Sequence, residues 1–196
     1  MSRNIKRLIF YFVYLVIVWG SFRYFVRLPE IIEELWFKPV LWLLPLIWWQ
    51  FSLKSRLNMF KGNKVGALLW GLLGGVIYVI LLRVLVGRSF SLDVNKVGIA
   101  FVTAVVEELT FAGFMLSVLL AEKKGEEWSL FFVSLGFALI HLPINIFVLH
   151  LPIVALLGAF LLAFCVGMIN GFLRLRSKSV WSPILAHFMY LIMVIG

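Results

Sequence analysis

Long apolar runs alternate with short polar segments along almost the whole chain. A helix of about 20 apolar residues crosses the hydrocarbon core of a bilayer, and shorter runs do so when flanking residues extend them. We therefore predict an all-α, polytopic membrane bundle of about seven spans, folded as one integral membrane domain over residues 1–196. The expected spans are residues 8–22, 39–53, 65–86, 97–120, 128–142 (apolar on to Leu149), 151–173 and 180–195.

Composition and charge support this interpretation and suggest an orientation. The chain is 63% apolar and 14% charged, with a mean hydropathy of +1.07. Soluble domains contain about 45–50% apolar residues and about 25% charged residues. With the N-terminus in the cytoplasm, twelve of the 18 Lys and Arg residues fall on the cytoplasmic side, as the positive-inside rule requires. We expect a prokaryotic plasma membrane and no nucleic-acid partner. The six outer basic residues are Arg23, Arg27, Lys38, Arg83, Arg88 and Lys96.

Two adjacent carboxylates, Glu107 and Glu108, lie in the middle of the run 97–120. An ionisable side chain at membrane depth costs roughly 2.5–3.5 kcal/mol on insertion scales, so it needs a function or a partner. A purely structural pair, held by Arg or by backbone groups, is the alternative to a functional one.

Two histidines are expected at the same depth as these carboxylates. At ~1.5 Å rise per residue, Glu107 lies ~15 Å from the start of its run, His141 ~20 Å from Trp128, and His187 ~14 Å from Lys178. Because all three are near the middle of a core ~30 Å thick, we predict that Glu107, Glu108, His141 and His187 share one mid-membrane polar cavity. His150 falls in a connection, where we assign it no chemistry.

Glutamate and histidine side chains in such a cavity suit hydrolysis. Glu107 can act as general base for a water molecule that His141 orients, while His187 donates to the oxyanion. The same set also fits a zinc ion bound by two His and one Glu, but no HExxH helix is present, so we expect no cofactor. A proton-coupled transporter that uses Glu107 and Glu108 is a further alternative, although the sequence lacks paired interrupted helices.

Three stretches resemble the motifs of one known family. The sequence EELTFAGF (107–114) is similar to EExxxR followed by Gly, and SLGFALIHLP (134–143) is similar to FxxxH through Phe137 and His141. The third, SVWSPILAHFMYL (179–191), is similar to HxxxN or HxxxD through His187. In order and spacing, residues 97–195 resemble the CAAX-protease and bacteriocin-processing (CPBP) intramembrane endopeptidases.

This resemblance implies a fold, an activity and residue roles. The family's fold is a helical bundle with a mid-membrane cavity opening towards the cytoplasm. Its members hydrolyse a peptide bond near the C-terminus of a lipidated or membrane-associated substrate, as in CAAX-box protein maturation. The implied catalytic set is Glu107 as water-activating base, His141 as its partner, His187 on the oxyanion side and Glu108 as the second glutamate. The expected partners are a membrane-embedded or lipidated peptide or protein and the lipid bilayer.

Two motif positions depart from the family. Ala112 replaces the arginine of EExxxR, which would lie one turn from Glu108. Leu191 replaces the Asn or Asp of the third motif and offers no hydrogen-bond donor, although Tyr190 or Asn170 could take that role. The alternative function is therefore a catalytically weak or inactive relative that serves as a membrane scaffold or bacteriocin-immunity factor.

Overall fold

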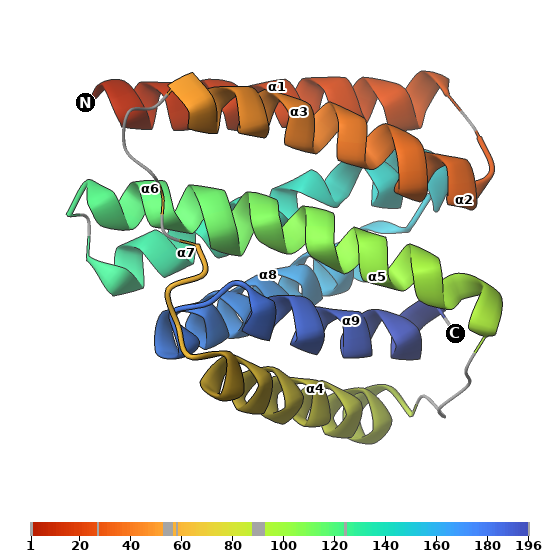
Figure 1. Cartoon of the computed structure of the whole chain (residues 1–196). Helices are drawn as coiled ribbons and strands as arrows, with labels where there is room; N and C mark the ends of the chain where they lie inside the picture. Colours follow the sequence, from red (N-terminus) through yellow and green to blue (C-terminus); the bar gives the residue numbers. More distant parts are fainter. Residues whose placement is uncertain are drawn as a thin grey trace.

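The computed structural model of the chain consists of helices joined by short connections (Figure 1). It describes residues 2–26, 28–52, 57, 59–87, 93–123 and 125–195. Within these residues the only extended pairing is a single bridge between Phe60 and Ser179. The helices are α1 (Arg3–Phe25), α2 (Glu30–Ile32), η1 (Glu33–Phe37), α3 (Lys38–Ser52), α4 (Lys64–Val86), α5 (Val94–Glu108), η2 (Leu109–Met115), α6 (Leu116–Ala121), α7 (Glu126–Ile140), η3 (Ile144–Val148), α8 (Ile153–Ser177) and α9 (Trp181–Ile195).

The chain is a membrane bundle, as the apolar runs predict. Five helices of the described chain are long and apolar enough to cross a membrane, and α9 is a shorter apolar helix of 15 residues. The second expected span forms one continuous helix with the polar segment before it, since α2, η1 and α3 follow without a break from Glu30 to Ser52. The predicted fold class is thus confirmed, and each of the seven expected spans coincides with a helix.

Successive long helices run in opposite directions, so the bundle has two ends (Figure 1). The N-terminal end holds the first residues of α1, α4, α7 and α9 and the last residues of α3, α6 and α8. The C-terminal end holds the last residues of α1, α4 and α9 and the first residues of α2, α5 and α8. Long-range hydrogen bonds join segments at each end: Asn4 Nδ2 donates to Glu122 Oε1 at 2.8 Å, and Lys96 Nζ donates to the Ile195 carbonyl at 2.7 Å.

The helix built from α5, η2 and α6 passes through the middle of the bundle and is the most buried candidate span (Figure 1). Its central turn, η2, is π-helical and follows directly after Glu108. A π-turn widens the helix by one residue per turn and is frequent at functional sites. The two carboxylates therefore lie at an irregularity of the most buried helix.

Gly71 and Gly75 form a GxxxG pair in the sequence, and this spacing of small residues predicts close packing against another helix. A Cβ added at Gly71 would lie 2.9 Å from Leu185 Cβ, and one at Gly75 would lie 2.1 Å from Met189 Sδ. Both glycines of α4 therefore contact α9.

Small residues recur at every fourth position along α8 (Ala155, Ala159, Ala163, Gly167 and Gly171), and this spacing predicts a smooth ridge that packs on another helix. The structure divides this small-residue ridge between two environments. A Cβ added at Gly167 would lie 2.9 Å from Ser134 Cα, and one at Gly171 would lie 2.3 Å from Leu130 Cδ1, both on α7. Ala159 and Ala163, one and two turns earlier, instead line the polar cavity described below. The expectation that the whole ridge packs on another helix is confirmed only for its second half.

Candidate active site

The predicted site residues converge from three separate stretches of the chain. Glu107 and Glu108 end α5, His141 follows α7, and His187 lies in the middle of α9. His141 Nε2 is 3.9 Å and His187 Nε2 is 3.7 Å from Glu107 Oε2. His187 Nδ1 is 2.7 Å from Glu108 Oε1. The convergence expected from equal depth is thus present in the structure.

The two oxygens of Glu107 have different surroundings. Oε1 accepts a hydrogen bond from Lys38 Nζ at 2.6 Å. Oε2 is buried and has no hydrogen-bond partner among the described residues. The 3.7–3.9 Å separations from the two histidine nitrogens are too long for direct hydrogen bonds but can be bridged by one water molecule.

Each histidine has a fixed orientation. His141 Nδ1 is 2.7 Å from the Phe137 carbonyl, which can only accept, so Nδ1 carries the proton and Nε2 faces Glu107. His187 Nδ1 likewise donates to the Glu108 carboxylate and directs Nε2 to the same oxygen of Glu107. In this way both Nε2 atoms are held towards Glu107 Oε2.

Glu108 lies behind His187 and does not line the cavity, which differs from the expectation that all four side chains share it. Successive residues of a helix point about 100° apart, so neighbouring glutamates face different partners. Asn170 Nδ2 donates to Glu108 Oε1 at 2.6 Å, and Tyr78 Oη donates to Asn170 Oδ1 at 2.8 Å. His187 and Asn170 are therefore the hydrogen-bond partners of Glu108, in place of the motif arginine that Ala112 replaces. Because Asn170 binds Glu108 and does not line the cavity, it is not placed as an oxyanion donor.

Lys38 is the functional candidate that sequence reasoning missed. We expected it among the outer basic residues, but its side chain is only 5% exposed and lines the cavity. Besides Glu107, it donates to Glu34 Oε2 at 2.7 Å. The i,i+4 spacing of Glu34 and Lys38 was a visible signal for their pair. The contact with Glu107, 69 residues away, left no local signal.

Further charged groups surround the lysine. Arg23 donates to Glu33 and, at 2.6 Å, to Glu34, and Thr103 Oγ1 donates to Glu34 at 2.8 Å. The Lys38 ammonium also lies 5.3 Å from the Trp42 ring centroid. The sequence pattern of Glu30, Glu33 and Glu34 predicts a polar, interfacial helix, but Glu33 and Glu34 instead belong to a buried ion network that ends on Glu107.

A cavity of about 610 Å³ contains Glu107, Lys38, His141 and His187. Its walls come from α1, the α2–α3 helix, α5, α7, η3, α8 and α9. Tyr190 and Leu191 both line it, so the position where the family motif has Asn or Asp faces the cavity without a donor. The predicted mid-bundle polar cavity is present.

The described residues do not suggest a metal centre. No three His, Cys, Asp or Glu side chains in that part of the chain converge as a metal-binding group, and an ammonium already neighbours Glu107. The expectation that no cofactor is needed stays a prediction. His150 is exposed in the connection between η3 and α8, away from these groups.

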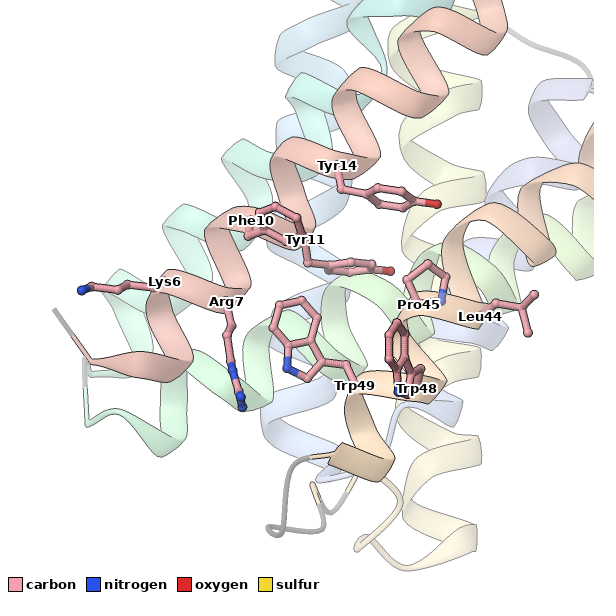
Figure 2. Close-up of a pocket in the computed structure, with 9 residues that line it drawn as sticks. All are labelled: Lys6, Arg7, Phe10, Tyr11, Tyr14, Leu44, Pro45, Trp48 and Trp49. Atoms are coloured by element: carbon pink, nitrogen blue, oxygen red, sulfur yellow. The ribbon is translucent and has the colours of Figure 1, made fainter.

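A larger hollow, of about 950 Å³, lies between α1 and α3 near the N-terminal end (Figure 2). It is lined by aromatic side chains, including Tyr11 and Trp49, and by the basic residues Lys6 and Arg7. Its described lining contains neither a carboxylate nor a histidine. The cluster of glutamate and histidine side chains therefore lies in the smaller polar cavity.

An all-α membrane bundle with a glutamate–histidine site on three helices defines a class of intramembrane hydrolase-like proteins. The family model described as "Type II CAAX prenyl endopeptidase Rce1-like" matches residues 92–193, just over half of the chain, and the chain belongs to this family. The expected CPBP resemblance is confirmed, and a protease-type function is supported. No curated protein and no solved structure matches the chain. Lys38 lies outside the matched residues.

Proposed function

We propose that the chain is an intramembrane endopeptidase that hydrolyses a peptide bond of a membrane-associated or lipidated protein or peptide, with water activated by Glu107. The observation that carries this proposal is the buried Glu107 Oε2, which has no hydrogen-bond partner among the described residues and faces the Nε2 atoms of two histidines. Membership of the CAAX endopeptidase family supports the reaction type.

In the proposed reaction, a water molecule occupies the space between Glu107 Oε2 and the two Nε2 atoms. Oε2 takes a proton from this water as the oxygen attacks the carbonyl carbon of the scissile bond. The C–N bond of the tetrahedral intermediate then breaks, and Glu107 returns the proton to the leaving nitrogen. The products are a carboxylic acid and an amine, and transfer of the acid's proton to the amine gives a carboxylate and an ammonium group, so atoms and protons balance.

The surrounding side chains have distinct proposed roles. Lys38 holds Oε1, which leaves Oε2 as the oxygen that accepts the proton. His141 Nε2, with its proton on Nδ1, accepts a hydrogen bond from the water and orients it. His187 donates to the oxyanion only when both ring nitrogens are protonated, with Nδ1–H bound to Glu108.

A second candidate function is an inactive relative that acts as a membrane scaffold or bacteriocin-immunity factor. Two observations favour it: Leu191 lines the cavity without a donor, and one oxygen of Glu107 is already paired with Lys38. An oxyanion without a donor at residue 191 would slow hydrolysis.

The two candidates are separated by sequencing peptide termini in membranes from cells that express wild type, Glu107→Gln or Glu126→Gln. Glu126 is an exposed residue at the start of α7 and serves as the matched control. An endopeptidase generates new termini with wild type and Glu126→Gln but not with Glu107→Gln. Identical termini in all three samples, at equal membrane levels of the protein, would favour the scaffold.

A further inference from the structure

The described residues that line the cavity extend from its middle to the C-terminal end of the bundle. Arg23, Glu30, Leu149 and Ile195 line it, and all four belong to the C-terminal end of the helices. Among the residues that the structure describes, none that lines the cavity comes from the N-terminal end. On that side, closely packed side chains such as Phe111, Phe114 and Leu116 separate it from the connections.

Basic residues are concentrated at the opposite end from this mouth. Twelve of the 18 Lys and Arg residues of the sequence belong to the N-terminus or to segments beside the α3–α4, α6–α7 and α8–α9 connections. This bias in Lys and Arg around short loops sets the orientation of a membrane protein, with the richer side in the cytoplasm.

Of the six basic residues that the sequence assigns to the outer side, Arg27 and Arg88 lie outside the described residues, and two others do not act as loop charges. Arg23 is buried in ion pairs with Glu33 and Glu34, and Lys38 is buried between Glu34 and Glu107. Lys96 also donates to the Ile195 carbonyl. Since paired, buried cations are not free to interact with lipid headgroups, the asymmetry between the two ends is larger than the sequence count indicates.

We infer that the cavity opens on the extracytoplasmic side of the membrane. The basic N-terminal end of the bundle is expected in the cytoplasm, and the mouth of the cavity lies at the opposite end. The mouth therefore faces away from the cytoplasm. The cytoplasmic opening implied by the family resemblance is therefore incompatible with the charge distribution of this chain.

Orientation determines which substrates can reach Glu107. The substrate assigned on this basis, which rests on the proposed function, is a peptide or protein segment that is exposed on, or inserted from, the extracytoplasmic face. A lipidated C-terminus that stays in the cytoplasm would face the closed, basic end. Ala159 and Ala163 line the cavity with small, apolar side chains, which leave room for such a segment.

Cysteine labelling in intact cells tests the orientation without requiring any cleavage. In a Cys165→Ser background, Glu30→Cys and Leu149→Cys report on the mouth, and both positions are exposed. Lys61→Cys and Glu127→Cys, also exposed, report on the N-terminal end. Each variant is treated with a membrane-impermeant maleimide before and after permeabilisation.

We expect both mouth cysteines to react in intact cells and both N-terminal-end cysteines to react only after permeabilisation. The reverse pattern, or reaction of both ends in intact cells, would overturn the inference. Mouth cysteines that stay unreactive after permeabilisation would also overturn it, because the cavity would then have no opening at this end. Labelling could show the expected orientation while the peptide termini in membranes are the same with wild type and with Glu107→Gln. That result would reject the proposed function and leave the inferred orientation standing.

Discussion

Glu107 and Glu108 are neighbours in the sequence, yet their side chains have separate environments. Glu107 directs one oxygen to Lys38 and the other into the cavity, whereas Glu108 is enclosed by His187 and Asn170. Helical geometry alone makes adjacent side chains diverge. We therefore assign chemistry to Glu107 and orientation of His187 to Glu108.

Glu108→Gln tests this division of roles. Glutamine keeps the size of the side chain but removes the charge that His187 Nδ1 faces. A hydrogen bond to a charged group contributes about 1.5–3 kcal/mol, so we expect cleavage to fall about ten- to a hundredfold. The measurement is the rate of peptide cleavage, with protein folding checked by thermal unfolding. A cleavage rate equal to wild type would remove Glu108 from the mechanism.

Leu191→Asn restores a donor at a position that faces the cavity. Loss of one oxyanion donor costs about 10²–10³ in kcat in other hydrolases, so we expect the variant to cleave at least about tenfold faster than wild type. Val194→Asn, which places the same group one turn nearer the mouth, is the matched control. Equal rates for wild type and both variants would contradict an oxyanion site at residue 191.

The pair of Lys38 and Glu107 is tested by a double-mutant cycle in detergent. Removing one partner of a buried ion pair costs about 3–5 kcal/mol. We expect Lys38→Met to lower the free energy of unfolding, and Lys38→Met with Glu107→Gln to recover part of the loss because the charge balance returns. Additive effects in the double variant would show that the two side chains are not coupled.

The sequence predicted which residues form the site where their depth in the membrane could be calculated from their position in a helix. Glu107, His141 and His187 could be brought together because helical rise converts sequence position into depth. Lys38 could not be found this way, because its long side chain reaches a partner on another helix and the sequence places it just before an apolar run and not inside one. The position of Glu108 behind His187 depends on helix rotation, which sequence spacing does not determine.

At the scale of elements, apolar run length predicted the helices well because backbone groups in lipid must be satisfied within each segment. Small-residue spacing predicted close packing at Gly71 and Gly75. It did not reveal that Ala159 and Ala163 face a cavity, since the same smooth surface suits a neighbouring helix or an open space. The π-turn η2 also had no sequence signal.

The packing of α4 on α9 predicts that an alanine substitution lowers stability at one glycine of α4 and does not lower it at another. A Cβ at Gly71 would lie 2.9 Å from Leu185 Cβ and 3.0 Å from the Ser182 carbonyl, whereas nothing lies within 4 Å of one at Gly66. Overpacking costs about 1–3 kcal/mol, and Ala in place of an unconstrained helical Gly gains about 0.8–1 kcal/mol.

We therefore expect Gly71→Ala to lower Tm in detergent and Gly66→Ala to leave it unchanged or raise it. Thermal unfolding of the two variants beside wild type is the measurement. A loss of stability in both variants, or in neither, would contradict the direct contact between α9 and Gly71.

At the scale of the whole molecule, the fold class and the family follow from the sequence, because hydropathy and three spaced motifs are local features. The direction in which the cavity opens does not follow from them. Loop charges predict which end of the bundle is cytoplasmic, but only the three-dimensional arrangement identifies which helix ends form the mouth.

The central claim is that Glu107 activates the attacking water. It is tested most directly by purified wild type, Glu107→Gln and Glu126→Gln in proteoliposomes, with quenched fluorescent peptides that carry or lack a farnesylated cysteine. A positioned general base contributes about 10²–10⁴-fold, so we predict that Glu107→Gln cleaves at least a hundredfold more slowly than wild type, while Glu126→Gln cleaves at the wild-type rate. Equal cleavage by wild type and Glu107→Gln, or no cleavage by wild type, would contradict the account.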